Sequence, residues 1–511
     1  MKLISAKSVL RLAIGAVVLA LVAVAIHYYW RWKMQEYRRE LQARGEKLSV
    51  ADLTPAPAPA DQNGAEIFRQ AAAALENFPG ILNTNPPSVM RMVGPGKAMV
   101  GWAQRDISDE TDRSTNAWAD LDEELAGEAV ALKALRQLTN YVILDFGAPY
   151  DLDSDQLGAH LPSEKRAAQL LAADAELCLH RGDIETAVAN VRAMLSLVRV
   201  TQDERTVMAQ LVRIAITQMA LGSTWELLQS PRVTEEQLAA VQSSWTQLEF
   251  RQAAENALLM ERAMGEQVIR HARRSSDTYR QAFHEKASTD WLGRANIKSK
   301  EFVWRLWWSL PDEMRALKGY QVLLDGTRFV QTNYAFRSKI LRQRTDLAEL
   351  GIVTLTNKDW WAIGLANPNL RSLFSQAVSS LAAYLSSLET VETCRQMALT
   401  TLALKRYQIR HGKYAPELAA LVPDFLPAVP RDPVDGKPLR YQLLGTSYLL
   451  YSIGEDGVDN GGDPVPTSSS AVVTNWMQGR DNVWPEPATE QEIQAYQNKL
   501  LFKGQSSPPH K

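Results

Sequence analysis

Residues 448–464, YLLYSIGEDGVDNGGDP, mark the point at which a strand-like pattern gives way to an acidic loop. Apolar and aromatic residues fill the first half, as they do in half-buried strands. Glycines and acidic residues fill the second half and leave nothing to build a hydrophobic core. Such a loop is either a solvated turn or a place where oxygen ligands gather, and the surrounding sequence bears on that choice.

The residues before this loop predict a small α+β module. Residues 439–444 and 447–453 are candidates for two strands, joined by a tight hairpin at Gly445-Thr446. A long helix, or two in line, is predicted over residues 370–411. It ends in several cations followed by Gly412, which suits both the helix dipole and a left-handed C-terminal cap.

Taken together, these features resemble the C-terminal domain of the major pseudopilins of type II secretion. The loop motif Pro-x-Asp-Pro-x-x-Gly-x-Pro matches residues 430–438, and the motif Tyr-Ser-x-Gly-x-Asp-Gly matches residues 451–457. The resemblance covers about 75 of the 511 residues. It implies a helix packed on a small sheet, located outside the cytoplasm.

The resemblance also implies a calcium ion in the last loop, held by carbonyls and acidic side chains. The matching candidates are the Leu450 carbonyl, Ser452, Asp456, Asp459, Asn460 and Asp463. Ca²⁺ takes about six to eight oxygens, and glycines let a short loop turn several of them inwards. The alternative is a solvated turn that only ends the hairpin, since the spacing departs from a full ligand set.

One departure from the family bears on function. Pilin-like subunits are trimmed after a glycine, and a glutamate five residues further on aligns them in the filament. Here Gly15 is followed by apolar residues, and no glutamate precedes Glu36. We therefore do not expect this chain to polymerise as a pilus subunit.

The N-terminal residues 12–29 are uncharged and almost wholly apolar. As a helix they would span about 27 Å, enough for one membrane crossing. Cations precede the segment, and interfacial aromatic residues and further cations follow it: Lys2, Lys7, Arg11, Tyr28, Tyr29, Trp30, Arg31, Trp32 and Lys33. We predict a transmembrane anchor, with a signal peptide cleaved near Ala23-Val24-Ala25 as the alternative.

The orientation of this anchor depends on two opposed signals. The cations after the apolar segment match or outnumber those before it, which favours a cytoplasmic body, but long domains translocate largely regardless of such charges. The pseudopilin-like module favours the opposite side. We predict a single-pass protein of the bacterial inner membrane with an extracytoplasmic body. Protein partners are expected, whereas the net charge of −2 gives no reason to expect nucleic acid.

The predicted fold class is mainly α, with an N-terminal transmembrane helix, an α-helical hairpin array and the small C-terminal α+β module. Five regions are predicted. They are a cytoplasmic tip and anchor (1–33), a juxtamembrane helix with a Pro/Ala linker (34–62), a helical scaffold (63–365), the long helix with the pseudopilin-like module (366–463) and a polar, disordered tail (464–511).

Within the scaffold, the clearest local signal is a helix corner at Gly182-Asp183. Gly182 can adopt the left-handed conformation that ends a helix, and Asp183 can cap the next one. With the small residue Ala187 after it, the corner resembles one tetratricopeptide-type hairpin, although no fixed period follows. Further on, the tryptophans near Trp304 favour packing between helices over a helix on the membrane surface.

Enzyme motifs with a known mechanism are absent from the sequence. It contains no Gly-x-Ser-x-Gly, His-Glu-x-x-His, Cys-x-x-Cys or Walker glycine loop. Its two cysteines, Cys178 and Cys394, are expected to be buried hydrophobic residues. We predict a non-enzymatic role in binding or assembly. One alternative is a component of a type II secretion or pilus-like machine. The other is an enzyme in the helical region, which three or more polar side chains meeting in one cleft would favour.

Overall fold

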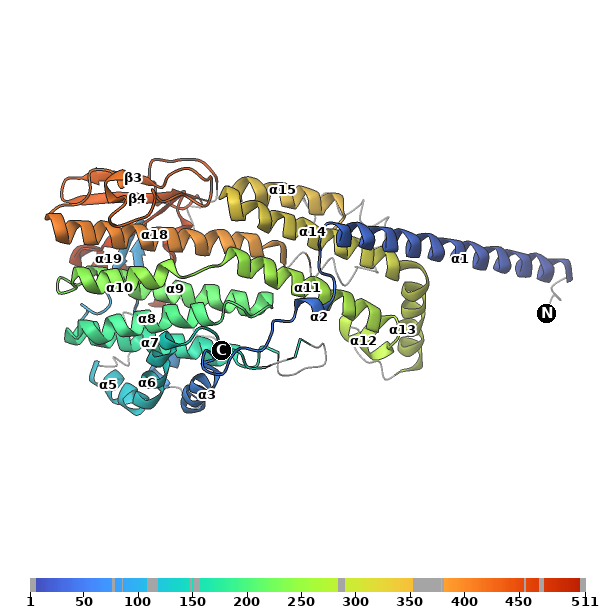
Figure 1. The fold of residues 1–511 in the computed structure, drawn as a ribbon, viewed down its shortest axis with the longest axis horizontal. Coiled ribbons are helices and arrows are strands. Elements are labelled where there is room, and N and C mark those ends of the chain that lie inside the picture. Colours follow the sequence, from blue (N-terminus) through green and yellow to red (C-terminus); the bar gives the residue numbers. More distant parts are fainter. Residues whose placement is uncertain are drawn as a thin grey trace.

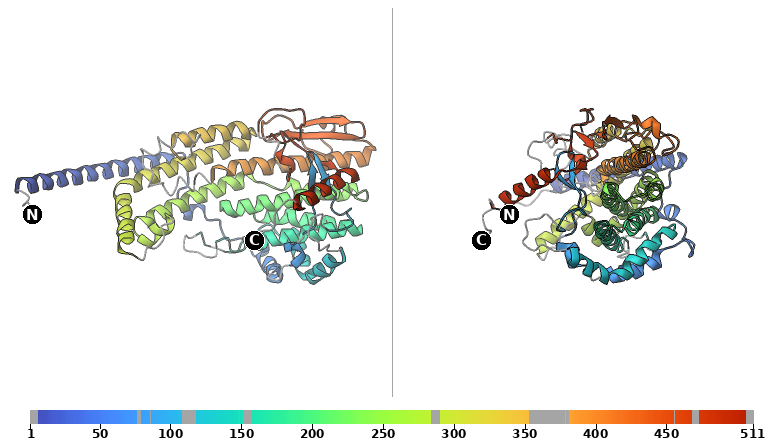
Figure 2. Two further views of the ribbon diagram at one scale, coloured as in Figure 1. Left: turned by 180° about the vertical axis from the view of Figure 1, so that it is seen from behind. Right: turned by 90° about the vertical axis from the view of Figure 1, so that its left-hand side faces the viewer.

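The computed structural model describes residues 6–75, 79–84, 86–107, 118–147, 149–150, 157–283, 290–352, 378, 381–454, 456–467 and 473–505. It is 65% helix with a small sheet content, which confirms the mainly α prediction. The body is elongated, and its longest helices run side by side along it (Figure 1). In the end-on view of Figure 2 the same helices are seen nearly down their axes.

The first half of the chain provides most of the helical body. Its elements are α1 (Ala6–Ala43), α2 (Val50–Leu53), α3 (Ala65–Ala74), α4 (Gly80–Thr84), β1 (Arg91–Gly94), β2 (Lys97–Met99), α5 (Trp118–Gly127), α6 (Ala129–Gln137), the 3-10 helix η2 (Leu138–Asn140), α7 (Leu161–Arg181), α8 (Ile184–Val200), α9 (Val207–Gln229) and α10 (Glu235–Thr246).

The second half completes the body and adds the C-terminal module. Its elements are α11 (Arg251–Ala272), α12 (Ser276–Ala282), α13 (Trp291–Val303), the π-helix η3 (Trp304–Trp308), α14 (Ser309–Asn333), α15 (Phe336–Glu349), α18 (Tyr384–His411), the 3-10 helix η4 (Leu418–Leu421), β3 (Arg440–Leu444), β4 (Ser447–Ile453), the 3-10 helix η5 (Trp476–Gln478), β5 (Asp481–Val483), β6 (Glu486–Pro487) and α19 (Glu490–Gln505).

Helices α7 and α8 form the predicted hairpin. Gly182 ends α7 in the left-handed conformation with φ of 79°, and the Asp183 side chain accepts a hydrogen bond from the Thr186 backbone N–H at 3.1 Å. Ala187 is fully buried between the helices. Helix α9 packs against both, and α10 and α18 add to the same bundle. The corner prediction is confirmed.

The C-terminal sheet has the order β3-β4-β5, and both pairings are antiparallel. Strands β3 and β4 form the predicted hairpin to within one residue. Asp432 fixes it to the preceding loop: its buried carboxylate accepts hydrogen bonds from Ser452 Oγ at 2.8 Å and from the Ile453 backbone at 3.0 Å, and pairs with Arg440 at 2.5 Å. Helix α18 contacts β4 and lies beside the hairpin (Figure 1).

The prediction of a disordered tail is wrong for residues 473–505. This segment forms η5, β5, β6 and α19. Strand β5 completes the C-terminal sheet, and β6 pairs with β2 in a second sheet of order β1-β2-β6. Trp476 and Trp484 are buried in the core. These partners lie far away in sequence, so the polar composition of the tail does not reveal them.

Two side-chain predictions are confirmed. Trp304 is 1% exposed, and its indole N–H donates to Asp312 at 2.8 Å, so it packs between helices. Cys178 and Cys394 are both buried, and neither forms a disulfide. The part of the predicted long helix before α18 lies outside the described residues, apart from residue 378 and residues 381–383.

Helix α1 is fastened to the body by its C-terminal part. Met34 packs against Met314 of α14. The Arg38 guanidinium pairs with two buried carboxylates, Glu266 of α11 and Glu313 of α14. Removing water from such carboxylates is costly unless a cation compensates them, so Arg38 ties α1 to both helices.

A second fastening follows directly after α1. The Glu46 carboxylate is 4% exposed and accepts a hydrogen bond from Arg262 at 2.8 Å, while Arg328 pairs with the same group. Burial acts to raise the pKa of Glu46, but the hydrogen bonds and charges of the two arginines outweigh it and lower the pKa to about 2. The ionised form is therefore strongly favoured in the fold.

The N-terminal half of α1 protrudes from the end of the body (Figure 1). Its side chains at positions 6–13, 16, 19, 20 and 23 lie outside the described ones. The exposed apolar side chains are Ile14, Val17, Val18, Leu21, Val22 and Val24. Among the residues that the structure describes, no helix combines the length and the apolar character needed to cross a bilayer. The predicted transmembrane helix is therefore not supported by the structure.

The Glu46 junction yields a stability prediction. Glu46→Gln leaves Arg262, which is 1% exposed on its side chain, without its anion. Breaking such a buried pair costs about 3 kcal/mol, so we expect a clear fall in the urea midpoint. The loss is expected above the unfolded pKa of about 4.5 and to shrink as the pH falls towards 2. Glu40→Gln, which removes an exposed pair with Arg44, is the matched control and should have little effect. Equal effects of the two substitutions would contradict the assignment.

Candidate functional site

The acidic loop after β4 holds the predicted calcium ligands, and its carboxylates already accept hydrogen bonds. Asp456 accepts from the Val458 backbone at 2.9 Å and from the Asn460 amide at 3.0 Å. Asp459 accepts from the Tyr451 hydroxyl at 2.9 Å. These are the contacts of Asx turns and loop packing, and they do not require an ion.

The other predicted ligands also have protein partners. Asp463 pairs with Arg480 at 3.2 Å, and Ser452 donates to Asp432 in the interior. The Leu450 carbonyl accepts a backbone hydrogen bond from the residue after β5. The structure therefore places all six candidates within one end of the module, each with a partner of its own.

Asp481, which the sequence did not single out, organises this loop. One oxygen of its buried carboxylate accepts backbone hydrogen bonds from Asn460 at 3.0 Å, Gly462 at 2.8 Å and Asp463 at 3.2 Å. Burial raises the pKa of Asp481, and the three hydrogen bonds oppose that rise. The N–H groups of the loop thus surround an anion. Calcium binding at this loop stays a prediction.

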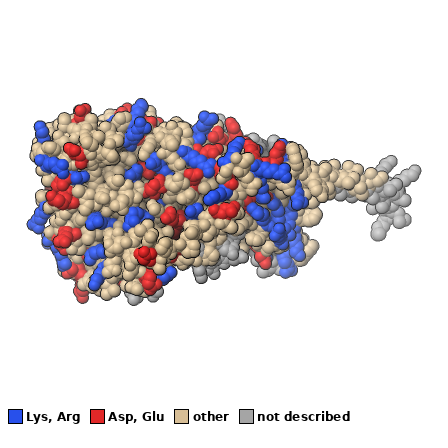
Figure 3. Space-filling view, in the orientation of Figure 1, with Lys and Arg blue, Asp and Glu red and all other residues tan. Residues whose placement is uncertain are grey.

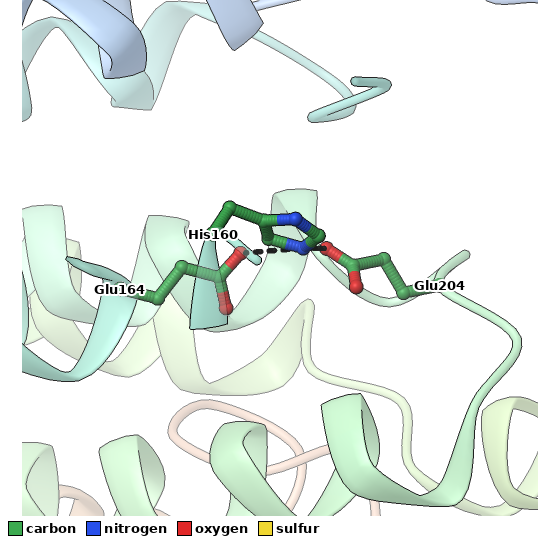
Figure 4. Close-up of side chains that lie close together, drawn as sticks. All are labelled: His160, Glu164 and Glu204. Carbon is green, nitrogen blue, oxygen red and sulfur yellow. Dashed lines mark hydrogen bonds and ion pairs between the residues drawn. The ribbon is translucent and has the colours of Figure 1, made fainter. Parts of the chain in front are cut away.

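A different group of side chains meets at the start of α7. His160 is the residue before the helix, and Glu164 lies one turn later, so the two side chains share a face. Glu204 comes from the turn between α8 and α9. Figure 4 shows the His160 ring between the two carboxylates. The hairpin packing of α7, α8 and α9 is what brings these three residues together.

The distances in this group suit a shared ion. His160 Nε2 lies 2.7 Å from Glu204 Oε1 and 3.6 Å from Glu164 Oε1. One ligand atom from each residue falls within 4.8 Å of the others. The ring of Phe146 stacks on the imidazole at 4.1 Å between centroids and restricts its rotation. The Glu204 segment is held by Gln210, whose amide donates to the Glu204 carbonyl at 2.6 Å.

The electrostatics of the group are unbalanced. Glu164 is fully buried, and neither of its oxygens has a hydrogen-bond partner. Burial, and after it the negative charge of Glu204, raise the pKa of Glu164 well above its usual range. Two carboxylates thus face one imidazole in a largely buried site. A bound dication would remove the imbalance because it stabilises both carboxylates in their charged form.

The site opens into a cavity of about 260 Å³. Its walls are the Pro-rich segment after α2, residues 143–147, 149 and 150, and the turn before α9. The His160 and Glu204 side chains are 14% and 16% exposed and line this cavity. The Glu164 side chain is fully buried and is not part of the lining. A metal held by three protein ligands keeps an open coordination position, and here that position would face the cavity.

A second pair of buried acids lies deeper in the bundle. Glu176 of α7 and Glu226 of α9 are both fully buried. Glu226 accepts backbone hydrogen bonds from Met90 at 2.7 Å and Gly101 at 3.1 Å. A Cβ on Gly101 would lie 1.8 Å from the Ser88 carbonyl and 2.4 Å from Glu176 Oε1, so only glycine fits there. Glu226 thus fixes the segment around β1 and β2 to α9.

Both of these acids favour the protonated form. Burial raises the pKa of Glu226 to about 8. Burial, followed by the charge of Glu226, raises the pKa of Glu176. The fold therefore binds more protons than the unfolded chain between about pH 4.5 and 8, and stability falls as the pH rises through that window.

We predict that Glu176→Gln reduces this pH dependence, because it removes one titrating group and its repulsion of Glu226. The fall in melting temperature between pH 5 and pH 8 should be smaller in the variant than in the parent protein. Glu185→Gln, an exposed change on α8, is the control and should leave the fall unchanged. An identical decline in all three proteins would contradict the assignment of this pH dependence to the buried pair.

Comparison with known protein families, with curated proteins and with solved structures finds no match for this chain. The resemblance to pseudopilins therefore depends on the motifs in residues 430–457 and on the order of elements around them.

One partial signal for the His160 site is present in the sequence. Histidine and glutamate four residues apart share a helical face, which is half of a common ligand arrangement. The third residue, Glu204, is separated from His160 by 44 positions, and only the fold of α7, α8 and α9 brings it close. No spacing rule could have found it.

Proposed function

We propose that this protein is a membrane-anchored component of the bacterial cell envelope whose helical body binds a divalent transition metal at His160, Glu164 and Glu204. The observation that carries the metal assignment is the buried Glu164 carboxylate, which has no hydrogen-bond partner and lies beside two further ligand side chains. One imidazole and two carboxylates suit zinc or a similar first-row ion better than calcium or magnesium.

Two features support the anchor. Residues 12–29 are uncharged and apolar, and the protruding half of α1 exposes side chains such as Val18 and Leu21 that are costly to leave in water. The aromatic residues Tyr28, Tyr29 and Trp32, all more than half exposed, follow at the point where a bilayer surface would lie. The Glu46 and Arg38 junctions would then hold the body at a fixed angle to the membrane.

The role of the body as a binding scaffold follows from its form. An elongated set of packed helices presents long surfaces at a defined distance from an anchor, which suits protein partners. The pseudopilin-like C-terminal module would place the body outside the cytoplasm, as part of or beside a type II secretion or pilus-like assembly. Kinship with that family is supported by the motifs and by a long helix beside a β-hairpin.

Metal-dependent hydrolysis is a second candidate function, favoured by the cavity at the open side of the site. A zinc ion with three protein ligands lowers the pKa of a bound water and so supplies a nucleophile near neutral pH. The meeting of three polar side chains in one cleft is the feature that favours an enzyme over a simple scaffold. His160, Glu164 and Glu204 would hold the ion, and the stacked ring of Phe146 would keep the imidazole oriented.

We predict that the tag-free protein binds one zinc ion per chain, measured by calorimetric titration. Loss of an outer-sphere partner weakens metal sites by about 10- to 100-fold, so loss of a ligand in His160→Gln or Glu204→Gln should cost at least as much. Binding should also weaken as the pH falls, because the ligands must lose their protons. The controls are His271→Gln and Glu185→Gln, which change exposed side chains elsewhere.

Each outcome of that titration is informative. Equal zinc affinity in the parent and in both ligand variants would reject the site. A parent protein that binds no zinc would likewise reject the metal assignment. A calcium titration that follows the melting temperature tests the acidic loop separately. A rise in melting temperature that Asp456→Ala abolishes would support calcium binding at this loop, whereas no rise in the parent protein would reject it.

A further inference from the structure

A cavity of about 480 Å³ lies where α1 enters the body, between α1, α11 and the start of α14. Its lining is strongly basic. The cationic or titratable residues around it are His27, Arg31, Arg38, Arg270, Arg273, Arg274 and Arg305, and the one acidic residue in its wall is Glu313.

The charges in this cavity are only partly compensated. Glu266, Glu301 and Glu313 pair with the arginines on its walls. Three carboxylates thus pair with four of the six guanidinium groups. Arg31 and Arg274 pair with none of the acidic side chains in the described part of the chain.

Several buried donors in the cavity wall also lack an acceptor. The Nε groups of Arg38, Arg273 and Arg305 are buried without a hydrogen-bond partner. A buried N–H of a charged group without an acceptor is costly, so such groups are normally satisfied by a ligand, an ion or water. Guanidinium forks match the oxygens of a phosphate in both shape and charge.

The position of the cavity restricts the source of that phosphate. It lies at the end of the body from which α1 protrudes, and Lys and Arg gather on the same end in Figure 3. Helix α13 lies across this end, roughly perpendicular to α1, in Figures 1 and 2. It exposes Trp291, Leu292 and Phe302, each at 60% or more, beside the cations Arg294 and Lys298. Exposed aromatic residues next to cations are typical of helices that lie on a bilayer surface.

We propose that this cavity binds the phosphate-bearing headgroup of an anionic phospholipid. The inference depends on the proposed membrane anchor, because the anchor would bring the cavity to the level of the headgroups. Arg31 and Arg274 are the residues left to neutralise the bound anion, and α13 supports the same end of the body on the bilayer. The lipid would thereby fix the body's orientation as well as its distance from the membrane.

The first test uses the full-length protein in a non-ionic detergent. Dihexanoyl-phosphatidylglycerol, below its micelle concentration, should bind saturably with one molecule per chain, at least about ten-fold more tightly than dihexanoyl-phosphatidylcholine. Each cation near a lipid headgroup contributes about a five-fold gain in affinity, so Arg31→Gln with Arg274→Gln should weaken phosphatidylglycerol binding by about 25-fold. Arg166→Gln with Arg192→Gln, two exposed arginines that do not line the cavity, is the matched control.

The results distinguish failure of the headgroup site from failure of the membrane anchor. Equal affinity for the two lipids, or equal loss in both double variants, would overturn the headgroup site. Inorganic phosphate that binds in the cavity while phosphatidylglycerol does not would assign the site to a free anion and overturn the lipid proposal. Vesicle flotation then tests the anchor alone: a protein that floats with neutral vesicles has the anchor, whatever the titration shows for the headgroup site, and one that does not float with them lacks the anchor.

Discussion

The Glu46 carboxylate lies between Arg262 of α11 and Arg328 of α14, where water hardly reaches it. The three charges can be buried only together, because each would be costly alone. This requirement fixes the chain after α1 against two long helices of the body. Arg38 repeats the arrangement eight residues earlier in the chain, with Glu266 and Glu313 as its partners. The direction in which α1 leaves the body is therefore set by buried ion pairs.

The arrangement of the end from which α1 protrudes depends on this junction. Because α1 is held against α11 and α14, the arginines of three elements line one cavity, and α13 lies across the same end. Elsewhere in the body, the bundle of α7, α8 and α9 brings His160, Glu164 and Glu204 together beside a separate cavity. Both sites share one physical cause: the fold buries more charge of one sign than its own side chains compensate.

Local signals in the sequence were sufficient for part of the fold. The left-handed Gly182 and the capping Asp183 predict the α7–α8 corner, and the alternating apolar pattern predicts the β3–β4 hairpin, because both depend on neighbouring residues. The sites were mostly out of reach. Glu204 meets His160 across 44 positions, and Asp481 holds a loop that begins more than twenty positions before it. The tail looked disordered because its strands are stabilised by distant partners.

The central claim is that the body holds α1 rigidly while the first half of the helix enters a bilayer. It is tested most directly by nitroxide labels on Val18→Cys and Arg39→Cys in vesicles, two positions that about 32 Å of helix separate. Burial raises the pKa of both native thiols, Cys178 and Cys394, to about 12, so they should stay unlabelled. We predict that the label at position 18 is accessible to oxygen and protected from an aqueous nickel complex, with the reverse at position 39. Labels at both positions equally accessible to nickel would contradict the claim.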